Sequence, residues 1–278
     1  MARVREAEVR EYQLMCELTE TRAKDELLAA LSNLDVADES SWPYVVELVT
    51  RLYSDYGRAF AELGRQFYQW CRDVQTGGEG TFVAETFWDD RGYGLLTNAV
   101  NGHLQDLSDD RKTEGEATTA IANSLGNFAF KASRDSIQHN LNEEWKARVA
   151  PATNGRLGFA RVPRAGCTCA FCIMMASRGF VYHTRETAGG GDPANRYHLN
   201  CRCAVVPMDA SDSTIAGYDE SGYLDLYETA RDALNANSLP REVYERIARA
   251  QARAEREGRT FKEINAVEIA MRHMHGLH

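Results

Sequence analysis

The sequence predicts a mainly α protein: an elongated helical bundle, a small metal-stapled α+β module inserted after it, and a helical C-terminal tail. Three observations predict this fold class. Helix-forming residues with apolar side chains three or four positions apart fill both ends of the 278-residue chain. Prolines and glycines concentrate between about residues 146 and 166. Cysteines and a histidine cluster directly after them.

The bulk composition is typical of a folded protein and limits its function. Hydrophobic residues make up 44% of the chain and charged residues 26%. A net charge of −9 argues against nucleic-acid binding by the whole surface. No apolar run approaches the roughly 20 residues that span a bilayer, and the first residues lack the apolar core of a signal peptide. We therefore expect a protein that stays in the cytoplasm or in a particle assembled there, with no membrane partner.

The first 145 residues are predicted to form a helical domain. One helix is expected over about 3–34, and further helices at 87–107 and 113–142. After the first of these, a second helix carries a heptad seam with Tyr or Phe at half of its positions. The seam residues are Val46, Val49, Tyr53, Tyr56, Phe60, Leu63, Phe67 and Trp70. This seam is typical of a helix packed in an antiparallel bundle, and it could also dock on a partner protein.

The remaining chain divides into a central module and a tail. Two short strands are predicted in the module, at 179–183 and 201–207, each next to the Cys/His cluster. Beyond a polar linker, helical patterns return at about 221–236, 241–256 and 260–274. The predicted domains are therefore 1–145, 146–207 and 208–278.

The cysteines and the histidine have the spacing of a zinc site. Cys169 and Cys172 form one close pair, His198 and Cys201 form a second pair, and Cys203 follows two positions later. Thiolates and imidazole suit Zn²⁺ better than a hard ion. Cys201 and Cys203 would point to opposite faces of a strand, so we expect one of them to bind the metal and favour Cys201. Buried free cysteines and a disulfide are the alternatives.

The predicted zinc is structural, and no catalytic residue is assigned. A catalytic zinc keeps an open position for water and has a general base nearby. The only acids of the module, Glu186 and Asp192, have no motif spacing to a histidine. A module of about fifty residues with two short strands needs the folding energy that a bound metal supplies. No small-molecule substrate is expected.

Charge is distributed unevenly along the chain. Between residues 156 and 206, seven arginines and two acids give a formal charge of +5, so the rest of the chain carries −14. A basic module on an acidic body predicts an anionic partner, either nucleic acid or an acidic protein face, although the arginines could also be solvated. The candidate contact residues are Arg161, Arg164, Arg178, Arg196 and Arg202.

The segment from about 160 to 207 resembles the signature of tailed-phage minor capsid proteins of the Mu minor-head (MuF-like) type, in the form common in phages of actinobacteria. The resemblance rests on "RVPRAGCTCAFCIMMASRG", "RYHLNCRC" and "VVP" in this order. An extra cysteine, Cys167, departs from the family motif. The motif itself falls on Cys169, Cys172, His198, Cys201 and Cys203.

The resemblance implies a minor virion component rather than an enzyme. Proteins of this type are associated with the portal vertex, are packaged inside the procapsid in few copies, and are linked to head morphogenesis and to DNA packaging or ejection. The implied partners are the portal protein, the major capsid protein and packaged double-stranded DNA, inside a procapsid or virion that assembles in the host cytoplasm. Two other classes stay open: a zinc-dependent nucleic-acid-binding protein, and a capsid maturation protease or nuclease.

Overall fold

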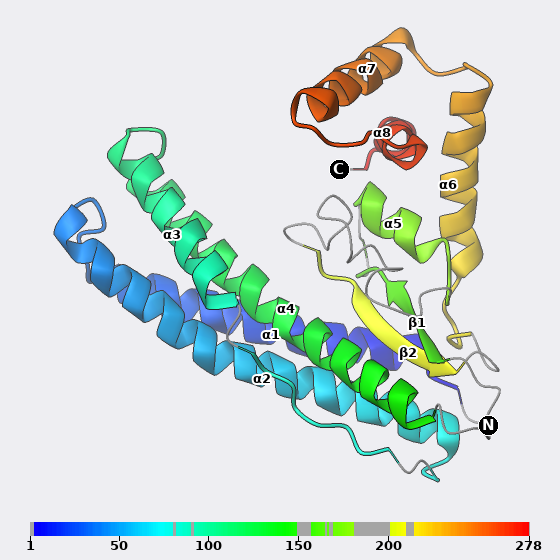
Figure 1. Ribbon diagram of the computed structural model, residues 1–278, viewed down its shortest axis with the longest axis horizontal. Helices are drawn as coiled ribbons and strands as arrows, with labels where there is room; N and C mark the ends of the chain where they lie inside the picture. Colours follow the sequence, from blue (N-terminus) through cyan, green and yellow to red (C-terminus); the bar gives the residue numbers. More distant parts are fainter. Residues whose placement is uncertain are drawn as a thin grey trace.

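Helices dominate the structure, a computed structural model that describes residues 3–79, 82–89, 92–148, 157–164, 166, 169–180, 201–209 and 214–277. The helices form two groups, and a two-stranded sheet lies between them (Figure 1). Within these ranges no helix combines the length and the apolar character that a bilayer span requires. The predicted fold class, mainly α with a small α+β module, is confirmed.

The first group is an elongated bundle formed by α1 (Glu6–Leu31), α2 (Trp42–Thr76), α3 (Gly92–Ser108) and α4 (Glu114–Arg148). Helices α1 and α2 form a hairpin, α4 packs along both of them, and α3 folds back on the first part of α4 (Figure 1). Gly77 ends α2 in the left-handed conformation at φ 67°, which glycine adopts without strain. All four helices were predicted from the periodicity of the sequence.

The start of α3 differs from the prediction of a helix over 87–107. Residues 82–89 instead have no regular secondary structure, and their backbone N–H groups donate to side chains of α2 and α4. The buried Asn140 side chain of α4 accepts a hydrogen bond from the Glu85 N–H at 2.8 Å and donates one to the Glu85 carbonyl, also at 2.8 Å. This amide satisfies both backbone groups of Glu85, which a helix would otherwise have to pair internally.

The heptad seam of α2 faces the core of the bundle. Val49, Tyr53, Phe60 and Phe67 are buried, and the other four seam residues are partly buried against the same core. Helices α2 and α4 are in close contact at Gly64, where a Cβ atom would lie 2.2 Å from the Ser133 carbonyl oxygen, so glycine is required there.

The sheet pairs two strands that lie far apart in the sequence. β1 (Leu157–Val162) runs antiparallel to β2 (Ala204–Asp209), with Val162 opposite Ala204. The prediction of a strand over 201–207 is wrong in its start, because residues 201–203 precede the ladder. The predicted strand 179–183 has two described residues, neither in a strand, and otherwise lies outside the described residues. β1 was not predicted as a definite strand.

Buried polar side chains join the sheet to the bundle. Gln13 of α1 donates to the Val162 carbonyl oxygen at 3.0 Å, and Gln75 of α2 donates to the Pro207 carbonyl oxygen at 2.8 Å. Beside Gln75, the buried Arg72 forms an ion pair with Glu144 of α4, with 2.9 Å between Nε and Oε2. Both strands are therefore attached to the bundle by hydrogen bonds with fixed geometry as well as by apolar contact.

The second group of helices packs against the module. It contains α6 (Glu220–Asn235), α7 (Arg241–Arg256) and α8 (Glu263–His275), close to their predicted positions. Of these, α6 and α8 pack against the short α5 (Ala170–Ala176), which the periodicity of the sequence did not predict, and α7 packs against α8. A second apolar core joins α5 to α6 and α8 through Ala170, Ile173, Met174, Ala230, Val267, Ala270 and Met271.

Candidate metal centre

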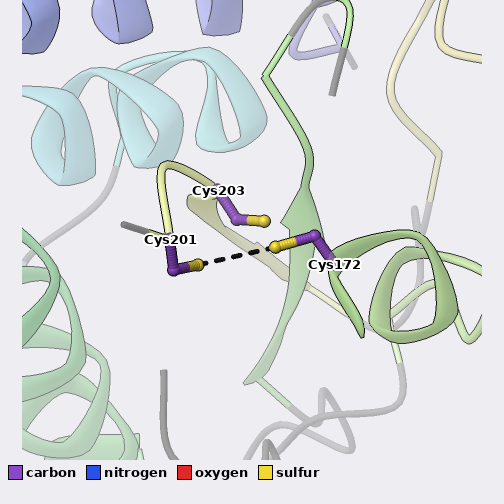
Figure 2. A group of neighbouring side chains, drawn as sticks. All are labelled: Cys172, Cys201 and Cys203. Atoms are coloured by element: carbon purple, nitrogen blue, oxygen red, sulfur yellow. Dashed lines mark hydrogen bonds between the residues drawn. The ribbon is translucent and has the colours of Figure 1, made fainter. Parts of the chain in front are cut away.

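Three buried thiols meet where α5 lies beside the start of β2. The Sγ atoms of Cys172, Cys201 and Cys203 all lie within 4.8 Å of one another. Cys172 belongs to α5, and the two other cysteines directly precede β2. In Figure 2 their side chains converge from these two segments. Among the described residues, this is the one group of three or more potential ligands with such proximity.

The geometry of the thiols fits a zinc site. The Cys172 and Cys201 sulfur atoms are 3.7 Å apart, far beyond the roughly 2.05 Å of a disulfide. Zinc–sulfur bonds of about 2.3 Å in a tetrahedral arrangement would place two sulfur atoms about 3.8 Å apart. The six cysteines in the described part of the chain are all free thiols. A soft, tetrahedral cation such as Zn²⁺ therefore matches both the donor atoms and their spacing.

The expectation that only one of Cys201 and Cys203 could bind a metal is wrong in its premise. Side chains alternate between faces only in a strand, and residues 201–203 lie before the strand begins. Their irregular backbone lets both thiols point toward Cys172 (Figure 2). The structure thus brings together three of the five predicted ligands.

The other predicted ligand within the described residues is close to the cluster. Cys169 is 9% exposed and belongs to the same buried cluster as the three thiols, although its sulfur is not among the three within 4.8 Å. It occupies the N-cap position of α5, with an extended backbone and no capping hydrogen bond from its side chain. His198 and the extra Cys167 lie outside the described residues. Cys169 and His198 are therefore the candidates for a fourth ligand.

Two buried guanidinium groups lie beside the thiol cluster and donate hydrogen bonds to Cys201. Arg161 is 1% exposed, and its Nη2 atom donates a hydrogen bond to Cys201 Sγ at 3.0 Å. Arg134 of α4 donates to the carbonyl oxygen of Cys201 at 3.3 Å. Three thiolates around one Zn²⁺ have a net charge of −1, which the nearest guanidinium would neutralise. Sequence reasoning assigned Arg161 to a partner-binding surface and missed this role.

The surroundings favour the thiolate form of Cys201. Hydrogen bonds from Cys172 and Cys203 have the largest effect in holding the pKa of Cys201 well below its ordinary value, and the charge of Arg161 adds to it. In Cys203 the hydrogen bond with Cys172 lowers the pKa, but contact with Cys201 and burial together raise it well above the ordinary value. Unlike Cys201, Cys16 lies outside the cluster, and burial raises its pKa to about 12. Metal binding would displace the remaining thiol protons of the cluster.

Arg202 is an internal anchor rather than part of an exposed surface. Its guanidinium binds both carboxylate oxygens of Glu20 in α1, at 2.6 and 2.5 Å. It also donates to Asn127 Oδ1 at 2.9 Å and lies over the Phe130 ring. The side chains of Arg202 and Glu20 are 14% and 9% exposed. This residue therefore links the segment that carries Cys201 and Cys203 to the bundle.

The predicted arginine surface is thus only partly present. Arg161 and Arg202 are used inside the fold, so the prediction of a solvent-facing set does not hold for them. Arg164 is half exposed and pairs with Glu17 at 2.5 Å. Arg178 is exposed, and Arg196 lies outside the described residues. Charge counting cannot separate arginines that neutralise buried groups from those that face solvent.

A helical bundle, a small sheet and a buried thiol cluster define a helical protein with a candidate structural metal centre. The family model described as VG15 protein matches residues 3–230, which include the bundle, both strands and the thiol cluster. The chain therefore belongs to the VG15 protein family, a family of phage proteins. No curated protein and no solved structure matches the chain.

Proposed function

We propose that this protein is a minor capsid protein of a tailed phage, of the Mu minor-head (MuF-like) type, that acts in head morphogenesis at the portal vertex. The observation that carries the proposal is that the ordered Cys/His signature lies within the residues that match a phage protein family. In this proposal the protein lies inside the procapsid or virion, where the portal or major capsid protein is its partner.

We further propose that the thiol cluster binds one structural Zn²⁺ through Cys172, Cys201 and Cys203, with Cys169 or His198 as the fourth ligand. The metal would join α5 to the start of β2. Because α5 also packs against α6 and α8, the same bond would connect the C-terminal helices to the sheet and the bundle. Closed sites of this kind stabilise a fold and leave no position for a reactive water. The protein is accordingly proposed to have no hydrolytic activity of its own.

Elemental analysis of the purified protein tests the metal site. We expect about one zinc per chain in protein prepared under reducing conditions without chelator. Cys203→Ala should abolish this zinc, whereas Cys71→Ala, which removes a buried thiol outside the cluster, should retain it. If wild-type protein contains no metal, the cluster consists of buried free cysteines and the zinc proposal is refuted.

Fractionation of virions and procapsids, followed by mass spectrometry, tests the capsid assignment. We expect the protein in purified procapsids at few copies relative to the major capsid protein, and in a complex with the portal protein after mild disruption. Its absence from both particles would refute a capsid role. Cleavage of a capsid precursor by the purified chain would instead support the maturation-protease alternative.

A further inference from the structure

One face of α7 carries a row of exposed arginines that the proposed function does not use. Arg246, Arg249, Arg253 and Arg256 are spaced three, four and three residues apart, which places them on one side of a helix. The helix buries Val243 and other small or apolar side chains toward its neighbours. None of the four arginines forms an ion pair within the described part of the chain.

This row forms part of a groove between α7 and α8. The groove has a volume of about 740 Å³, and Arg259 from the connecting loop and Arg272 from α8 contribute to its lining. Its one acidic lining residue, Glu268, pairs with Arg272 at 2.6 Å. The lining thus contains six arginines and a single carboxylate. Arg259 pairs with Glu257 outside the lining, so the excess positive charge of the groove comes from the α7 row, which a bound polyanion would neutralise.

We propose that this groove binds the phosphate backbone of duplex DNA. Guanidinium groups form bidentate hydrogen bonds with phosphate, and every basic residue of the lining is arginine. The α7 row extends from Arg246 to Arg256, a separation of ten positions or about 15 Å along the helix. Duplex DNA has about one phosphate of each strand per 3.4 Å of its axis, so this length measured along the axis corresponds to about four phosphates of one strand.

The lining favours a duplex over the other polyanions. A bound acidic peptide would be expected to insert large apolar anchors into pockets, but the apolar lining consists mainly of alanines. Binding of a single strand relies on bases stacked on aromatic rings, and the lining has only one aromatic residue, Phe261. Contacts to a regular phosphate backbone need neither feature.

All residues that line the groove belong to α7, α8 and the loop between them, beyond the residues that the family model matches. Helix α7 lies on the side of the C-terminal group that faces away from the bundle (Figure 1). The VG15 match ends at residue 230, before α7 begins. The inference therefore goes beyond the proposed function, and it assigns DNA binding to residues outside the Cys/His module.

Fluorescence anisotropy with the full-length protein and a labelled duplex of about 30 base pairs tests the inference, over about 50–300 mM salt. The test variant combines Arg249→Gln, Arg253→Gln and Arg256→Gln. The control combines Arg51→Gln, Arg58→Gln and Arg241→Gln, which removes the same charge from exposed positions outside the groove. Thermal melts of both variants should match the wild type, because all six side chains are exposed.

We expect the groove variant to lose about two orders of magnitude in affinity at 0.1 M salt. The slope of log K against log salt should become shallower by about 2.7, since each lost phosphate contact contributes about 0.9. The control should bind within about threefold of wild type. The inference is overturned if wild-type protein does not bind the duplex at 50 mM salt, if both variants weaken binding equally, or if polyglutamate or single-stranded DNA binds more tightly than the duplex.

Discussion

Replacing Arg202 by methionine removes the charge that anchors the cysteine segment to the bundle while retaining much of the side-chain volume. Arg202 forms two short hydrogen bonds with Glu20 and one with Asn127. We expect Arg202→Met to destabilise the protein strongly. If Arg202 faced solvent to contact DNA, as the sequence suggested, the same change would have little effect on stability.

The magnitude follows from the burial of Glu20. Removing one partner of a buried ion pair typically costs about 3–5 kcal/mol, because the other charge stays buried. Here Lys24 still binds Glu20, with 2.6 Å between Nζ and Oε1, so the lower end of the range applies. We therefore expect the free energy of unfolding to fall by about 3 kcal/mol. With a urea m-value of about 3 kcal/mol/M, the midpoint would shift by about 1 M.

Urea denaturation followed by far-UV circular dichroism measures this change, and Arg164→Met is the matched control. Arg164 also pairs with a glutamate of α1, but its side chain is 54% exposed. Exposed pairs of this kind contribute about 0–1 kcal/mol. Equal, small losses for both variants would show that the Arg202 pair does not anchor the module, and would contradict our account of this junction.

Two further predictions concern the bundle. Gly64→Ala should lower the free energy of unfolding by about 2 kcal/mol or more, because its Cβ atom would meet the Ser133 carbonyl oxygen at 2.2 Å. Gly102→Ala in α3, with no atom within 4 Å, should be neutral or stabilising in the same urea titration. Burial and the neighbouring Lys112 hold the pKa of His103 below 6.5. Stability should therefore increase with pH from the lowered pKa up to about 6.5, and His103→Gln should reduce this dependence in melts across that range.

The order and approximate bounds of most helices could be predicted from sequence, because apolar periodicity is a local property. A side chain recurring every three or four residues needs only its own helix to form a buried stripe. The seam of α2 and the helices of the C-terminal group were found in this way. The pairing of β1 with β2 could not be predicted in this way, because the strands lie about forty residues apart in the sequence. Which strand pairs with β1 depends on tertiary contacts that no local pattern of residues records.

The sequence determined the types and spacing of the ligands at the candidate metal centre, since Cys-x2-Cys and His-x2-Cys-x-Cys are visible in one dimension. Only the tertiary structure decided which thiols meet. The backbone before β2 turns both Cys201 and Cys203 toward Cys172, and α5 positions Cys172 opposite them. Arg161, an isolated basic residue in an otherwise apolar strand, becomes their hydrogen-bond donor only in the folded chain.

The arginines show most clearly what the sequence determines and what tertiary packing decides. Formal charge is a property of the sequence, but exposure and partners depend on residues elsewhere in the chain. Tertiary contacts place Arg202 against Glu20, 182 positions earlier, and so remove it from the surface. The row on α7 was present in the sequence as a helical stripe, yet its groove exists only because α8 folds back beside it. Sequence determined which charges are available, and packing decided which of them face solvent.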